Sequence, residues 1–179
     1  MKKFLFAVSV LLLALGASAL AQDNASVVKS VRAAYAAAKE KIKMADGEMA
    51  PRNDAVATLH YNVPATGPRT TVAHCYFDLD TDEDGAHYYP YFITLKYNVT
   101  VRDFYEEYLY DPESGRLLFV FLQQDTFEGT KNEERYYYDD LGHLAAVNIT
   151  GERTVEDAAL VSHAEALRMI IPKFLDFPY

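Results

Sequence analysis

The chain has 179 residues, a formal net charge of −9 at pH 7, a single cysteine and no tryptophan. The acidic balance disfavours nucleic acid and anionic lipid surfaces as partners, because both repel the chain over long range. One cysteine excludes an internal disulfide, so stability must come from the burial of apolar side chains.

The first residues have the organisation of a secretory signal peptide of bacterial style. Met1-Lys2-Lys3 precedes an apolar run from Phe4 to Leu15, and small residues end at Ala19-Leu20-Ala21. The run is shorter than the roughly 20 residues of a membrane span. We therefore predict a signal peptide at residues 1–21, cleaved near Ala21. Residues 22–179 are then one exported domain, soluble in the periplasm or outside the cell.

Two segments have the apolar periodicity of amphipathic helices. The first covers residues 26–44, with Ser26 as its N-cap and Asp46-Gly47 as its stop. The second starts at Thr154, which stands three residues before Asp157 as in a capping box. Their apolar stripes contain Val28, Val31, Tyr35, Ala38 and Ile42 in the first helix, and Leu160, Ala164, Leu167 and Ile171 in the second.

The chain between these helices is rich in aromatic and β-branched residues, which favour strands. Two aromatic segments each run into a turn that Asp opens and Gly closes, at residues 108–117 and 136–144, which predicts two hairpins. We expect an α+β fold with an N-terminal helix, an antiparallel meander of about six strands, flat or curved, and a C-terminal helix. Both helices are expected on one face of the sheet.

The strand Leu117–Leu122 is apolar at every position, and this predicts cover on both of its faces. With both helices on one face, three alternatives remain for the other. The sheet curls over on itself, two chains pair as a homodimer, or a ligand fills the groove.

A candidate calcium loop lies in the acidic run Asp80-Thr81-Asp82-Glu83-Asp84-Gly85. Asp80, Asp82 and Asp84 stand at alternate positions, so their carboxylates can converge on one hard cation. Position twelve, where a bidentate Glu belongs, is Tyr91. This pattern excludes a helix–loop–helix hand and leaves a non-helical calcium loop beside its alternative, a solvated acidic connection.

Motifs for catalysis are absent from the sequence. The five histidines show no metal-ligand spacing, and there is no G-x-S-x-G elbow, Rossmann fingerprint or phosphate loop. Cys75 is interpreted as a buried small apolar residue, with an intermolecular disulfide or a reactive thiol as the alternatives. Fourteen tyrosines and ten phenylalanines supply strand-forming and cross-strand residues, or rings on which a ligand stacks.

These observations favour a non-catalytic protein of the cell envelope that binds a protein or a small molecule with one face of an aromatic-rich sheet. Two hypotheses from other classes are kept. One is a secreted hydrolase with carboxylates in a concavity of the sheet. The other is a structural protein stabilised by calcium.

Overall fold

The structure is a computed structural model, and it describes residues 2–65, 67–126 and 128–175. A long helix, seven strands and a second helix follow one another along the chain, which confirms the predicted α+β order. Seven strands replace the expected six or so. The elements are α1 (Lys2–Asp46), β1 (Asp54–Val63), β2 (Gly67–Asp82), β3 (Gly85–Val99), β4 (Arg102–Tyr110), β5 (Leu117–Asp125), β6 (Lys131–Tyr138), β7 (Leu144–Thr150) and α2 (Asp157–Leu175).

The strands form one antiparallel sheet in the order β1-β2-β3-β4-β5-β6-β7, so each strand pairs with its neighbours in sequence. Such a meander needs only hairpin connections. β5 therefore lies inside the sheet, as its apolar sequence predicts.

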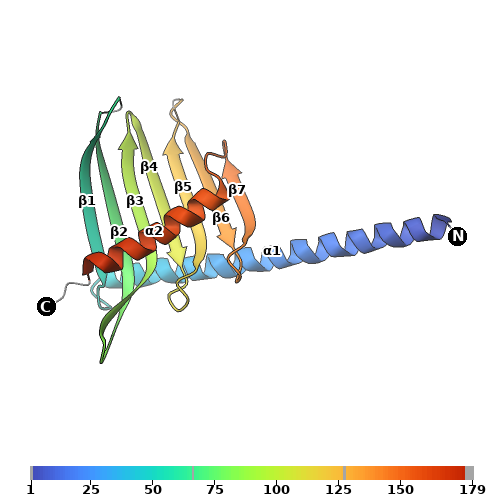
Figure 1. The fold of residues 1–179 in the computed structure, drawn as a ribbon, viewed down its shortest axis with the longest axis horizontal. Helices are drawn as coiled ribbons and strands as arrows, with labels where there is room; N and C mark the ends of the chain where they lie inside the picture. The colour runs from blue at the N-terminus through green and yellow to red at the C-terminus, as the bar shows by residue number, and fades with distance from the viewer. Residues whose placement is uncertain (1, 66, 127, 176–179) are drawn as a thin grey trace.

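The helices lie on opposite faces of the sheet, so the expectation of both on one face is wrong. Figure 1 shows α2 crossing in front of the strands and α1 passing behind them. Successive residues of a strand point to opposite faces, and β5 divides accordingly. Phe119 packs in the cluster with Val31 and Ile42 of α1, and Val120 packs in the cluster with Leu160 of α2. A strand that is apolar on both faces is buried when each face receives its own helix.

The apolar stripe of α1 packs as its sequence predicts. Val31, Ala38 and Ile42 are all buried, and Tyr35 makes edge-to-face contacts with Phe92 and Phe119 at 5.8 and 5.4 Å between ring centroids. The helix begins well before residue 26 and includes the segment predicted as a signal peptide. Among the residues that the structure describes, no helix is long and apolar enough to cross a membrane.

The second helix begins at Asp157 and not at Thr154. The backbone N–H of Thr154 donates to Glu134 Oε1 at 2.9 Å, and its hydroxyl donates to the same oxygen. Asp157 accepts a hydrogen bond from the Tyr138 hydroxyl at 2.8 Å. Thr154 therefore attaches the segment before α2 to β6. Its hydroxyl does not cap the helix, because it donates to the buried carboxylate of Glu134 instead.

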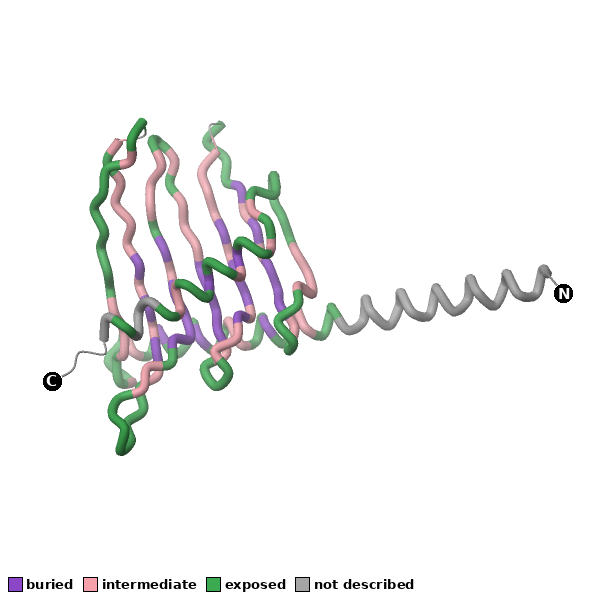
Figure 2. The backbone as a smooth tube through the Cα atoms, in the orientation of Figure 1, coloured by how far each residue is buried: buried purple, intermediate pink, exposed green. Residues whose placement is uncertain are grey.

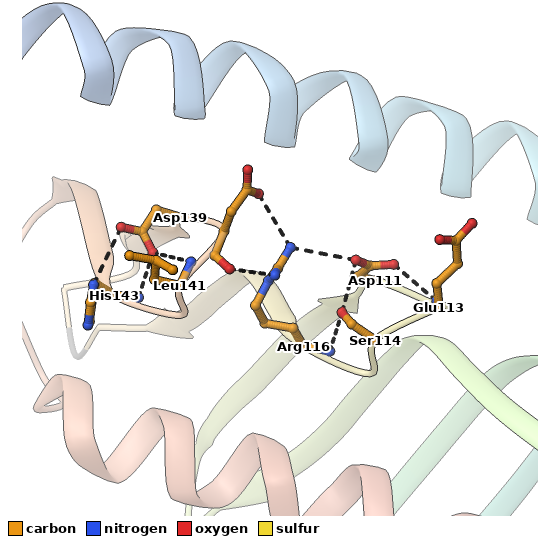
Figure 3. A network of polar contacts seen from close by, with 8 residues as sticks. Asp111, Glu113, Ser114, Arg116, Asp139, Leu141 and His143 are labelled. Carbon is orange, nitrogen blue, oxygen red and sulfur yellow. Dashed lines mark hydrogen bonds and ion pairs between the residues drawn. The ribbon is translucent and has the colours of Figure 1, made fainter.

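The two predicted hairpins are confirmed, and their turns lie next to each other (Figure 3). Arg116, at the end of the first turn, donates to the backbone carbonyl of Asp140 in the second at 2.5 Å. It also lies 3.6 Å from Asp111, while Asp139 accepts the amides of Leu141 and His143, both at 2.8 Å. The repeated Asp therefore organises each turn locally, and a single arginine ties the two turns together.

Each helix covers only part of its face. Buried residues concentrate where the helices cross the strands, and the strand ends away from the helices are half-buried or exposed (Figure 2). Where each helix ends its cover of the sheet, a cleft lies between the side of the helix and the uncovered strands.

Candidate functional site

An apolar cleft lies between α2 and the face of the sheet that α2 covers, and we call it the α2 cleft. Its volume is about 440 Å³, within the range of small-molecule sites. Most of its lining is apolar or aromatic. The lining residues are Tyr61, Arg69, Thr71, Leu95, Tyr97, Glu106, Tyr108 and Leu122 from the sheet, and Val155, Ala159, Leu160 and His163 from α2 and the segment before it.

Helical periodicity explains the α2 wall of the cleft. Leu160 and Ala164 are buried on the sheet, whereas Ala159 and His163 are exposed and line the cleft. Ala159 and His163 are four residues apart, so they stand on one side of the helix. Because Ala159 has a small side chain, the helix leaves space above the sheet at this point.

Glu106 is the central polar group of the α2 cleft. Its carboxylate accepts hydrogen bonds from the hydroxyls of Tyr97, at 2.6 Å, and Tyr108. The ring Nε2 of His163 lies 3.8 Å from Glu106 Oε2. Burial and the adjacent Glu106 raise the pKa of both tyrosines, so both hydroxyls stay protonated donors. The cleft therefore has a fixed acceptor at its sheet wall.

A second glutamate on the same face, Glu134, has a structural role. It pairs across the strands with Leu122, which pairs in turn with Glu106. Glu134 is 1 % exposed and accepts from Tyr136, from Asn132 and twice from Thr154. These bonds use its oxygens to hold the entry to α2. Glu106 of this pair lines the α2 cleft, and both glutamates line a small pocket of about 70 Å³ that shares Tyr97 and Leu122 with it.

A corresponding cleft of about 320 Å³ lies on the α1 face, beside the helix. Its carboxylate, Glu107, is 5 % exposed and accepts from the hydroxyls of Tyr35 at 2.6 Å and Tyr105 at 2.7 Å. Lys39 lies 3.5 Å from Glu107 and balances its charge. Arg135 lies over the Phe121 ring at 4.7 Å and pairs with Glu133 at 2.7 Å. Glu107 and Arg135 are thus each paired with an opposite charge outside the lining, whereas Arg32, which also lines this cleft, lies over the Tyr137 ring at 5.9 Å.

The bare part of the α1 face forms a wider trough of about 660 Å³. Three aromatic residues, Tyr97, Phe104 and Tyr105, line it together with polar and charged side chains, which include Lys96, Asp103, Gln123, Asp125 and Lys131. The Lys131 amine donates to Gln123 at 3.2 Å. This trough contains four charged side chains, which bind water well, whereas the α2 cleft has a more apolar lining, so we take the α2 cleft as the candidate site.

The predicted calcium ligands lie elsewhere, at the tip of the β2–β3 hairpin. Asp82 pairs with Gly85 across a two-residue turn. Its Oδ1 accepts the backbone N–H of Asp84 at 2.8 Å and lies 2.9 Å from Nε2 of His87. The hydrogen bond from His87 lowers the pKa of Asp82, and the same contact raises the pKa of His87.

Calcium binding by Asp80, Asp82 and Asp84 stays a prediction. Asp80 uses Oδ1 to accept the neighbouring amide of Thr81 at 2.8 Å. Within the described part of the chain, no three His, Cys, Asp or Glu side chains converge closely enough to hold a metal ion.

Cys75 has the buried position predicted for it. It is 0 % exposed on β2, in the cluster beneath α2, and burial raises the pKa of its thiol to about 12.

The tyrosine side chains are divided between the two faces of the sheet. Tyr108 and Tyr110 point toward α2, whereas Tyr35 and Tyr105 meet Glu107 on the α1 face.

Glu106 and His163 are the functional candidates that the sequence did not single out. Their signal was weak. In the sequence, the pair Glu106-Glu107 shows only as an acidic interruption of an aromatic strand. Comparison with protein families, with curated proteins and with solved structures finds no match for this chain.

Proposed function

We propose that this protein is an exported, non-catalytic binding protein that holds a small apolar or aromatic molecule in the α2 cleft. The observation that carries the proposal is the combination of an apolar and aromatic lining with one central acceptor, Glu106. Sites for small molecules have this composition, in which apolar walls supply affinity and a few polar groups fix orientation.

The chemistry around Glu106 defines the polar part of the ligand. A carboxylate has about four acceptor positions, and the two tyrosine hydroxyls use two of them. A hydroxyl or amine of the ligand donates to a remaining position. The hydrogen bond is strong because the acceptor is charged and only 13 % of its side chain is exposed.

Export of the protein is part of the same proposal and rests on the N-terminal sequence. The expected product of cleavage begins at Gln22. N-terminal sequencing of the protein recovered from its producing cells checks this. A chain that still begins at Met1 contradicts export through a cleaved signal peptide.

Two matched variants of α2 test binding in the cleft. Ala159 lines the cleft, whereas its neighbour Ala158 is exposed outside it. Phenylalanine at position 159 fills the space, and phenylalanine at 158 adds the same ring to the surface. We expect N-phenylnaphthylamine, a neutral apolar fluorophore, to bind wild type and Ala158→Phe with equal affinity and Ala159→Phe at least tenfold more weakly. Equal affinity for all three proteins, or no binding to wild type, contradicts the proposal.

A further inference from the structure

The first edge of the sheet, β1, is an open strand. Within the described residues it pairs with β2 alone, and residues 56–62 are all exposed. Val56, Leu59 and Tyr61 are large apolar side chains that are 58 %, 53 % and 44 % exposed. A strand edge with unpaired N–H and C=O groups is a template for another strand.

β1 lacks the devices with which proteins usually protect such an edge. Between Ala55 and Val63 it contains no Lys, Arg, Asp, Glu or Pro, and its register with β2 has no bulge. The opposite edge, β7, is shorter, and its residues 144–147 are half-buried, with Ala146 packed in the cluster beneath α1. The two edges therefore differ, and β1 is the exposed one.

The hydrogen bonds of β1 show which of its groups point outward. Phe77 of β2 donates its backbone N–H to the carbonyl of Asn53 at 3.1 Å, so Asn53 faces β2. The backbone groups of an antiparallel strand alternate in direction, and the pairing continues without a break to Val63. The residues whose N–H and C=O point away from the sheet are therefore Asp54, Val56, Thr58, His60 and Asn62.

This outward set is symmetric about Thr58. We propose that two copies of this chain pair antiparallel along β1, with a two-fold axis at Thr58. Thr58 then faces the partner's Thr58, Val56 faces the partner's His60, and Asp54 faces the partner's Asn62. Every outward N–H and C=O between residues 54 and 62 receives a partner in this register.

The side chains suit the same register. Opposed residues of an antiparallel pair share one face, so Leu59 lies against the partner's Ala57 and Tyr61 against the partner's Ala55. Large side chains thus meet small ones, and exposed apolar surface is buried.

The local charges along β1 are compatible with a second copy. The chain as a whole has a net charge of −9, which keeps copies apart at most surfaces. Along β1 the carboxylate of Asp54 already pairs with Arg52 at 2.8 Å, and no like charges oppose each other in the proposed register. The two-fold axis also closes the assembly at two copies, because each β1 is used once.

Cysteine cross-linking tests the register. Thr58→Cys brings two cysteines opposite each other with Cα atoms about 5.5 Å apart, which a disulfide spans. Val56→Cys is the matched control, because four residues along the strand separate the two copies of position 56, roughly 13 Å. Cys75 does not compete, since it is fully buried.

We expect native mass spectrometry of wild type to show a dimer that increases with protein concentration. On mild oxidation Thr58→Cys forms a covalent dimer, whereas Val56→Cys and His60→Cys do so only when they are mixed. If wild type stays monomeric at every concentration, the proposal is wrong. The same result is expected if β1 pairs with a different protein. Equal self-cross-linking of Val56→Cys and Thr58→Cys overturns it as well.

Discussion

Glu106 and Glu107 are neighbours on β4, yet their carboxylates lie on opposite faces of the sheet. Glu106 accepts from Tyr97 and Tyr108 on the α2 face, and Glu107 accepts from Tyr35 and Tyr105 on the α1 face. Glu106 borders the α2 cleft, and Glu107 borders the cleft beside α1. The sandwich therefore places one glutamate, held by two tyrosine hydroxyls, beneath each helix.

The hydrogen bond from Tyr35 to Glu107 contributes to the docking of α1. We expect Tyr35→Phe to lower the free energy of unfolding by about 1–2 kcal/mol, because a largely buried carboxylate loses one donor. Tyr61→Phe, which removes an exposed contact to Thr71, should change stability little. Urea denaturation compares the two variants. Equal stability of Tyr35→Phe and wild type contradicts this role.

Truncation of two adjacent β5 residues tests whether both faces of the sheet are packed. Phe119 and Val120 are 6 % and 0 % exposed, beneath α1 and α2 respectively. Phe119→Ala should cost about 3–5 kcal/mol and Val120→Ala about 2–3 kcal/mol, measured by chemical denaturation. If one of them costs less than about 0.5 kcal/mol, as surface substitutions do, one face is open and the sandwich is wrong.

Asp54 should contribute to the acid denaturation of the protein. The hydrogen bond from Arg52, helped by His74 and opposed by partial burial, lowers the pKa of Asp54 from 3.8 to about 2. A carboxyl whose pKa is depressed on folding stabilises the protein above its unfolded pKa, and this contribution is lost as the pH falls through the folded pKa. Stability of Asp54→Asn should therefore fall less steeply than that of wild type between about pH 4 and pH 2. Parallel pH profiles in denaturation experiments would show that this pair contributes nothing.

Cys75 should be unreactive in the folded protein. Its thiol is buried and its pKa is raised to about 12, so little thiolate is present at neutral pH. We expect an aromatic disulfide reagent to label it only after denaturation. Rapid labelling of the native protein, or a wild-type disulfide dimer, would revive the alternative of an intermolecular bond.

The calcium hypothesis is tested at the tip of the β2–β3 hairpin. If Asp80, Asp82 and Asp84 hold calcium, millimolar calcium raises Tm, a chelator reverses the rise, and Asp82→Asn abolishes it. Calcium then displaces His87 from Asp82, so the rise is larger at pH 8 than at pH 5, where protonated His87 competes. If neither calcium nor a chelator changes the Tm of wild type, the calcium hypothesis is wrong.

Much of the fold follows from the sequence because the signals are local. The Asp-to-Gly turns predict the hairpins, and the unbroken apolar run at residues 117–122 predicts an interior strand with two covered faces. The placement of the helices does not follow in the same way. Apolar periodicity shows that each helix has one buried side but is silent on which face of the sheet that side meets. Because β5 is apolar on both faces, each face needs a covering element, and this indicates that the two helices lie on opposite faces of the sheet.

The candidate site was harder to predict, because it is assembled from distant segments. Glu106 comes from β4, Tyr97 from β3 and His163 from α2, and no spacing in the sequence connects them. The acidic run at residues 80–85 has the stronger local pattern but lies at the tip of a hairpin. Local patterns identify turns and loops well, whereas a cleft depends on how a helix crosses a sheet.

Native mass spectrometry of the protein purified from its producing cells tests the binding function most directly. We expect wild type and Ala158→Phe to carry the same additional non-covalent mass of a small molecule, which Ala159→Phe lacks. Wild type without any bound mass, or Ala159→Phe with the same bound mass as wild type, would contradict ligand binding in the α2 cleft.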